Sequence, residues 1–191
     1  MRIIAGTHRG RALASVGKGD PSAHLRPTTD RVRENLFNVL ASGRFGNPLE
    51  NAQVLDLFAG TGALGLEALS RGAETCYFVE KMTAAWAVIE NNIHALDAGD
   101  KTHLLKRDAV KLGNHDKQAP LFNLVFLDPP YGKGLAEKTL LCLKEGGWLA
   151  EDALLVVEED KRAGFMTPLG FDEINRRTYG DTEITLLSYT S

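Results

Sequence analysis

The sequence predicts an α/β protein built on a mostly parallel sheet of seven strands. Between residues 53 and 158, short apolar segments typical of buried strands alternate with helical segments. This alternation is typical of parallel sheets that are covered by helices on both faces. After it, segments 171–179 and 182–190 are joined by Gly180-Asp181, which predicts an antiparallel hairpin at the end of the sheet.

The residues before this alternating region predict an extended arm followed by one helix. Segment 2–5 is a candidate short strand, and segment 18–22 predicts a flexible loop because it combines glycine, aspartate and proline. The helix should end at Gly43, and its apolar positions recur at helical spacing. The candidate N-caps are Thr28, Thr29 and Asp30, and the apolar positions are Val32, Leu36, Val39 and Leu40.

From residue 52 onward the elements follow in a regular order. The expected strands cover residues 54–58, 75–79, 103–106, 122–127, 153–158, 171–179 and 182–190, and the expected helices cover residues 63–71, 83–96 and 135–144. At 191 residues the chain fits a single domain. We therefore expect one domain over residues 1–191, with a basic arm and helix in 1–45 and a core in 52–191.

Composition excludes several classes of protein. No apolar run reaches the length of a membrane-spanning helix, and the first residues lack the apolar stretch of a signal peptide. The two cysteines, Cys76 and Cys142, lie in apolar segments and are interpreted as free thiols in a reducing compartment. We therefore expect a cytoplasmic protein that does not contact membranes.

Charge is distributed unevenly along the chain. Residues 1–33 carry seven basic and two acidic side chains, whereas the remaining 158 residues carry 15 basic and 23 acidic side chains. A basic arm on an acidic body indicates one face that binds a polyanion. The alternative is a solvated, disordered N-terminus.

An acidic residue or a glycine loop follows each of the first four core strands. Asp56 and a Gly-x-Gly-x-x-Gly segment at 60–65 belong to the first, and Glu80, Asp108 and Asp128 follow the next three. Ligands of open parallel sheets bind at the carboxyl ends of the strands. Four carboxylates at that edge are hard to explain structurally, because buried carboxylates need partners.

The glycine segment matches a dinucleotide-binding fingerprint, which by itself is a weak signal. The glycines permit close approach of a ligand, although a plain strand-to-helix turn is the alternative interpretation. Asp56 could hold an ammonium group or orient the loop. Asp108 suits an exocyclic adenine amine, and the backbone N–H of Ala109 suits a ring nitrogen. These features disfavour a nicotinamide cofactor.

The most specific signal is Asp128-Pro129-Pro130-Tyr131. Consecutive prolines remove two backbone donors and hold the chain extended, so that neighbouring carbonyls project outward. A carboxylate and a carbonyl can together accept both hydrogens of a planar amine, and Tyr131 offers a face on which a base can stack. A proline turn with a buried tyrosine is the alternative.

With these motifs the chain resembles class I S-adenosylmethionine-dependent methyltransferases, and more narrowly the RsmD-type family, which methylates guanine N2 in bacterial small-subunit (16S) ribosomal RNA. Segments 2–6, 26–34, 55–65 and 128–131 carry the resemblance, which covers nearly the whole chain. The insertion-like segment 18–23 departs from the family pattern. The resemblance implies a Rossmann-like class I methyltransferase fold with a short N-terminal extension.

The resemblance also implies roles for individual residues. Asp128, Pro129 and Tyr131 would act on the target base, with Asp128 accepting from the guanine amine and Tyr131 stacking on the ring. Arg9, Arg11, Arg26, Arg31 and Arg33 would contact RNA phosphates. The residues implied in cofactor binding are Thr29, Asp56, Phe58, Gly60, Gly62, Glu80, Met82, Asp108 and Ala109.

The expected partners are S-adenosylmethionine and either small-subunit ribosomal RNA or an assembled 30S particle, with no metal and a monomeric enzyme. The alternatives are an N6-adenine DNA or other nucleic-acid amino-methyltransferase, a nicotinamide oxidoreductase, a non-catalytic RNA-binding module and a protein glutamine methyltransferase. The length leaves no room for a separate DNA-recognition region, and Asp128 with the basic arm favours nucleic acid over protein.

Overall fold

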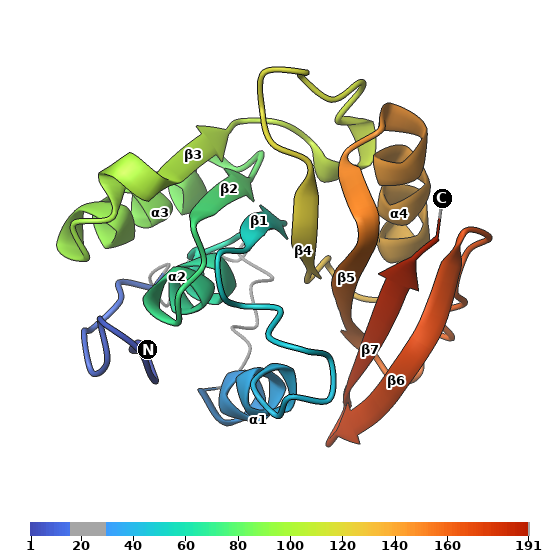
Figure 1. Ribbon diagram of the computed structural model, residues 1–191, viewed down its shortest axis with the longest axis horizontal. Helices are drawn as coiled ribbons and strands as arrows, with labels where there is room; N and C mark the ends of the chain where they lie inside the picture. Colours follow the sequence, from blue (N-terminus) through green and yellow to red (C-terminus); the bar gives the residue numbers. More distant parts are fainter. Residues whose placement is uncertain (16–29, 191) are drawn as a thin grey trace.

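The computed structural model describes residues 1–15 and 30–190, in which seven strands form a single sheet (Figure 1). The strand order is β3-β2-β1-β4-β5-β7-β6. The strands are β1 (Gln53–Leu57), β2 (Thr75–Val79), β3 (Thr102–Leu105), β4 (Phe122–Leu127), β5 (Leu149–Asp160), β6 (Phe171–Tyr179) and β7 (Thr182–Tyr189). The helices are α1 (Asp30–Leu40), α2 (Ala63–Ser70), α3 (Thr83–Ala95) and α4 (Leu135–Gly146), with short 3-10 turns η1 (Gly99–Lys101) and η2 (Ala109–Lys111).

The pairing confirms the expected class. From β3 to β5 all neighbouring strands are parallel, whereas β7 runs antiparallel to both β5 and β6. The carboxyl ends of β1 to β5 therefore lie at one edge of the sheet. β5 is longer than the expected 153–158, because it begins at Leu149 opposite Phe122 and pairs with β7 as far as Asp160.

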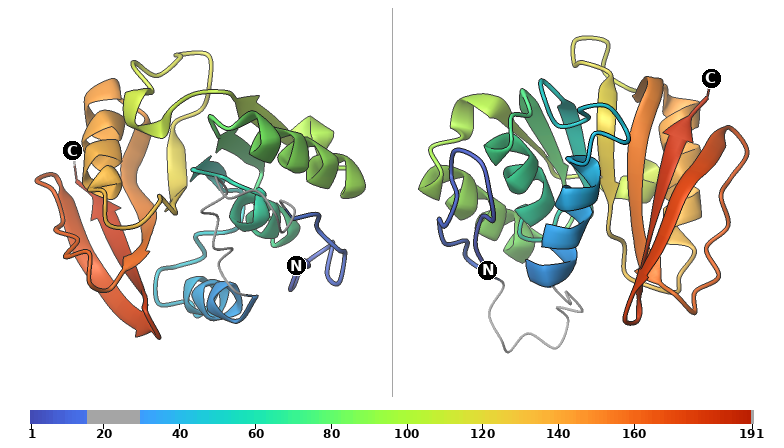
Figure 2. Two further views of the ribbon diagram at one scale, coloured as in Figure 1. Left: turned by 180° about the vertical axis from the view of Figure 1, so that it is seen from behind. Right: turned by 60° about the horizontal axis from the view of Figure 1, so that its bottom comes forward.

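Helices cover both faces of the sheet (Figures 1 and 2). Helices α1, α2 and α3 share one apolar cluster with the sheet, in which the rings of Phe37 and Phe126 lie 5.8 Å apart. Helix α4 packs on the other face, where Phe122 and Trp148 stack with centroids 6.1 Å apart. No helix within the described residues is long and apolar enough to cross a membrane.

Residues 1–15 are docked on the helical layer, and the expected strand at 2–5 is reduced to one antiparallel bridge between Arg2 and Ala12. The carboxylate of Glu67 in α2 accepts hydrogen bonds from the backbone N–H groups of residues 4 and 5, at 2.7 and 3.0 Å. Gly6 adopts a φ of +83°, and a Cβ there would lie 1.7 Å from the carbonyl oxygen of Ser70. Only glycine permits this approach, so the described part of the arm is a fixed part of the fold.

Candidate active site

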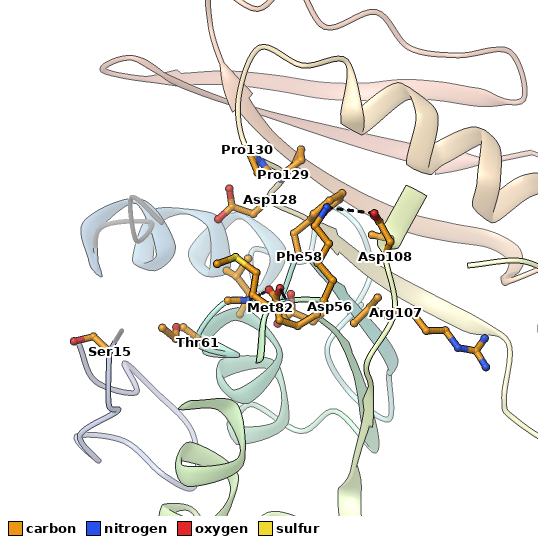
Figure 3. Close-up of a pocket in the computed structure, with 18 of the residues that line it drawn as sticks. Ser15, Asp56, Phe58, Thr61, Met82, Arg107, Asp108, Asp128, Pro129 and Pro130 are labelled. Atoms are coloured by element: carbon orange, nitrogen blue, oxygen red, sulfur yellow. Dashed lines mark hydrogen bonds and ion pairs between the residues drawn. The ribbon is translucent and has the colours of Figure 1, made fainter. Parts of the chain in front are cut away.

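A pocket opens at the carboxyl ends of β1, β2, β3 and β4, as the strand-end pattern predicts (Figure 3). Residues of the N-terminal arm and α1 complete its wall, among them Met1, Ser15 and Arg33. In Figure 3, Asp128, Pro129 and Pro130 lie together on one side, Phe58 lies near the centre, and Asp108 comes from the segment after β3. The described strand-end acids thus share one cavity.

The structure brings most of the predicted cofactor residues to this pocket. Gly62 is the exception among the described ones, because it does not line the pocket and is instead the N-cap residue of helix α2. Thr29 falls outside the described residues. The residues on the lining are Asp56, Phe58, Gly60, Glu80, Met82, Asp108 and Ala109.

Asp56 is a buried carboxylic acid at the base of the pocket, with an exposed fraction of 2%. Its Oδ2 accepts a hydrogen bond of 2.9 Å from the backbone N–H of Gly65 in the first turn of α2. Burial raises the pKa of Asp56 to about 8, and the nearby charge of Glu80 acts in the same direction. A cationic group bound beside it would favour the ionised form.

The close fit between α2 and the sheet depends on Gly65. A Cβ at this position would lie 2.4 Å from the sulfur of Cys76 and 2.5 Å from the ring of Phe78. The missing side chain allows the first turn of α2 to lie directly on β2, within reach of Asp56. Burial also raises the pKa of the Cys76 thiol well above its usual range, so Cys76 is an inert core residue.

Glu80 uses both carboxylate oxygens to order the loops around it. Oε2 accepts from the N–H of Gly60 at 3.1 Å, and Oε1 accepts from the N–H of Met82 at 2.8 Å. Each oxygen has a second acceptor site. Glu80 therefore positions the glycine loop and the start of α3 while it keeps acceptor capacity toward the pocket.

Asp108 forms an ion pair that sequence inspection missed. Its Oδ2 lies 3.2 Å from the Nζ of Lys81, and its Oδ1 accepts from the N–H of Val110 at 3.3 Å. The Lys81 side chain is 59% exposed, so the pair is accessible and contributes little to stability. Lys81 directly follows Glu80 at the end of β2, a position from which a long cation reaches the next strand end.

The Asp128–Tyr131 loop is held by two carboxylates at the end of β5. The Tyr131 hydroxyl donates to Glu158 Oε1 at 2.7 Å, and the N–H of Gly132 donates to Glu159 Oε1 at 2.9 Å. Burial and the charge of Glu158 raise the pKa of Tyr131. The hydroxyl is therefore a neutral donor whose partner belongs to the protein, and the aromatic ring remains as the part that can meet a ligand.

Arg33 is buried, whereas the predicted contact with an RNA phosphate requires an exposed side chain. Its exposed fraction is 1%, and its Nη2 donates to the carbonyl of Arg2 and to Asp30. Its Nε and Nη1 are buried and have no hydrogen-bond partner within residues 1–15 and 30–190, although the residue borders the pocket. Arg33 precedes Leu36 and Phe37 by three and four positions, which is helical spacing, and this signal places it on the buried face of α1.

The other arginines predicted to bind RNA differ in their surroundings. Arg9 and Arg31 are exposed. Arg11 is also exposed, and its Nη1 donates to the carbonyl of Ala95 at the end of α3, at 3.1 Å. Arg26 lies outside the described residues. The contacts of Arg9, Arg11 and Arg31 with RNA stay predictions.

One lining residue that sequence reasoning did not assign is Arg107. Arg107 borders the pocket and donates through Nη1 to the carbonyl of Leu112 at 3.3 Å. Its position directly before Asp108 is the signal that could have identified it. In residues 1–15 and 30–190, no three His, Cys, Asp or Glu side chains gather into a candidate metal site.

A mostly parallel seven-stranded sheet with a C-terminal antiparallel hairpin, helices on both faces and this pocket at the strand ends defines the class I methyltransferase fold. The sequence profile of the family described as Conserved hypothetical protein 95 matches residues 1–188. The chain belongs to this family, which is the RsmD-type family that the sequence resembles.

Curated relatives and solved structures agree with this membership. "Ribosomal RNA small subunit methyltransferase D" of Escherichia coli K12 is 43% identical over 167 residues, which span 87% of this chain and 78% of the relative. The protein of the same name from Haemophilus influenzae is 35% identical over 181 residues, 94% of this chain and 89% of that one. The solved structure of "Putative methyltransferase yhhF" from Escherichia coli has a TM-score of 0.83 at 36% identity and covers 100% of this chain and 98% of that one.

Proposed function

We propose that this protein transfers a methyl group from S-adenosylmethionine to the exocyclic N2 of a guanine in bacterial small-subunit ribosomal RNA. The observation that carries the proposal is the pocket shared by Asp56, Glu80 and Asp108 with the Asp128–Tyr131 loop. Cofactor-type and base-type recognition groups thus face one cavity. The names of the relatives supply the RNA class.

The methionine end of the cofactor fits two buried groups of the pocket. It carries one ammonium and one carboxylate. Asp56 is a buried acid whose ionised form needs a cation, and Arg33 is a buried cation on the lining with two nitrogens that have no partner among the described residues. An ammonium beside Asp56 would favour its ionised form, and a carboxylate at Arg33 would accept hydrogen bonds from these two nitrogens.

The nucleoside end fits the acids that follow β2 and β3. Glu80 retains an acceptor site on each oxygen after its two backbone bonds, as two ribose hydroxyls require. Asp108 would accept from the adenine amine and Ala109 would donate to a ring nitrogen, with Met82 as an apolar wall. When bound, the cofactor supplies an electrophilic methyl group on a sulfonium.

The loop after β4 would orient the nucleophile. Asp128 and a backbone carbonyl of the loop would accept the two hydrogens of the guanine amine, which turns its lone pair out of conjugation. Tyr131 would stack on the ring. Asp128 need not be a strong base, because the amine becomes acidic once methylated, so most of the rate would come from positioning. A base paired in a helix must be extruded to reach this pocket.

The test is transfer of labelled methyl groups to four substrates: naked small-subunit RNA, assembled 30S particles, duplex DNA and bulk protein. We expect incorporation into one of the two small-subunit substrates, and nuclease digestion of the product should release N2-methylguanosine. Label in N6-methyladenine of DNA, or in no small-subunit substrate, would contradict the proposal. Calorimetry with S-adenosylmethionine and with NAD is the control for cofactor class.

A further inference from the structure

The end of β5 carries two adjacent buried carboxylates that the proposed function does not use. Glu158 and Glu159 have exposed fractions of 3% and 4%. Buried acids of this kind are unfavourable unless they accept strong hydrogen bonds. Each of them accepts such a bond: Glu158 from Tyr131 of the Asp128–Tyr131 loop, and Glu159 from Gly132, the residue after it.

The two bonds restrain different parts of the loop. Glu158 Oε1 accepts a hydrogen bond of 2.7 Å from the hydroxyl of Tyr131, which fixes the far end of the ring. Glu159 Oε1 accepts a hydrogen bond of 2.9 Å from the N–H of Gly132, which fixes the backbone directly after the tyrosine. It also accepts a hydrogen bond of 3.1 Å from the N–H of Asp160. A ring held at its tip and at its backbone cannot rotate away without breaking one of these bonds.

The hairpin contributes to the same restraint. The side chain of Thr182, at the start of β7, lies close to the hydroxyl of Tyr131 and acts to lower its pKa, and Thr182 pairs with Asp160 of β5. The hydroxyl of Tyr131 is therefore bonded to β5 and bordered by the neighbouring antiparallel strand β7, each part of the rigid sheet. Sites supported by strands hold their geometry more closely than sites supported by loops.

We infer that Glu158 is a positioning residue for methyl transfer, which fixes the direction in which the Tyr131 ring, the surface on which the target base stacks, projects. The inference rests on the proposed function and deepens it. It assigns the tyrosine hydroxyl to the protein and its ring to the base. Removal of the hydroxyl should therefore slow transfer although the stacking face itself remains.

The test compares Tyr131→Phe, Glu158→Ala and the double variant with the wild-type protein in methyl transfer at saturating cofactor. Misplacement of the base should lower kcat by about tenfold to a hundredfold in either single variant. Because both variants remove the same bond, the double variant should lose little more than the worse single variant. Cofactor affinity should not change, since the Tyr131 hydroxyl is bonded to Glu158 and Glu158 does not line the pocket.

Two further variants separate positioning from folding. Glu158→Gln keeps an acceptor oxygen and should restore kcat to within about threefold of wild type. Glu151→Ala removes an exposed carboxylate from the other end of β5 and should leave kcat unchanged. As a readout independent of activity, the fluorine NMR signal of 3-fluorotyrosine at position 131 should shift in Glu158→Ala and return toward its wild-type position in Glu158→Gln.

The outcomes are distinguishable. The inference would be overturned if the wild-type protein transfers methyl groups and Tyr131→Phe does so at the same rate. It would also be overturned if the losses of the two single variants multiply in the double variant. Either result would leave the proposed function standing. Absence of transfer by the wild-type protein would overturn the proposed function and the role in transfer with it. In that case the NMR signals would still show whether Glu158 orients the ring.

Discussion

Replacement of Asp56 by asparagine should make the protein more stable and a weaker cofactor binder. The side chain is buried, and its pKa rises from 3.8 to about 8. Between these values the unfolded chain has released the proton and the folded chain has kept it. The free energy of unfolding therefore decreases by about 1.4 kcal/mol per pH unit as pH rises from 4 toward 8. At pH 7 the ionisable side chain destabilises the fold by about 4 kcal/mol relative to a neutral one.

Asparagine removes this linkage and keeps an oxygen that can accept the N–H of Gly65. The free energy of unfolding of Asp56→Asn, minus that of wild type, should increase by about 3 kcal/mol between pH 5 and pH 7. Urea denaturation followed by far-UV circular dichroism at both pH values measures this difference. The matched control is Asp172→Asn, which changes an exposed aspartate on β6. A stability difference that is the same at pH 5 and pH 7 would refute the reasoning.

Three other substitutions test separate parts of the structure. Asp128→Ala should lower methyl transfer by at least about a hundredfold while calorimetry shows unchanged cofactor affinity; loss of cofactor binding would contradict its assigned role. Arg33→Gln should weaken the binding of S-adenosylhomocysteine about tenfold or more. It should not weaken the binding of 5′-methylthioadenosine, which lacks the carboxylate; equal losses of affinity for both ligands would show a general packing effect. Gly6→Ala should destabilise the protein by about 2 kcal/mol more than Gly10→Ala. Both glycines have φ near +82°, but only at Gly6 would a Cβ collide with Ser70. An equal decrease in melting temperature for the two variants would refute the close approach.

The strand-end acids were predictable because they obey a rule of topology. Once the alternation of strands and helices indicates a parallel sheet, Asp56, Glu80, Asp108 and Asp128 must lie at one edge. Some of their partners are local, since Glu80 bonds to Met82 two residues later and Asp108 bonds to Val110. Others are distant in sequence, since Glu80 also bonds to Gly60 and Asp108 pairs with Lys81. Strand order was therefore sufficient to bring the four acids to one edge, but not to give all of their partners.

Contacts between distant segments were not predictable in the same way. The bond from Tyr131 to Glu158 spans 27 residues and depends on β5 extending past the end of β4, which only its pairing with β7 establishes. The docking of residues 4 and 5 on Glu67 spans more than 60 residues. A sequence pattern gives the face of an element, but not which distant element will cover that face.

Arg33 shows how a residue type can mislead. Its charge led to the expectation of a phosphate contact, whereas its spacing to Leu36 and Phe37 is that of the buried face of α1, on which it lies. For a residue inside a helix, position on the helical wheel carried more information than side-chain charge.

The place of β7 in the sheet has a consequence for synthesis of the protein on the ribosome. The strand lies between β5 and β6 and begins with Thr182, which lies close to the hydroxyl of Tyr131. Until β7 has left the exit tunnel, β5 has no neighbour on that side and presents an unpaired edge. The nascent chain can pair β1 to β5 early, but the Asp128–Tyr131 loop gains its neighbour on β7 only when residues near 182 become available. Co-translational folding should therefore include a late step that completes the sheet and the surroundings of the Asp128–Tyr131 loop together.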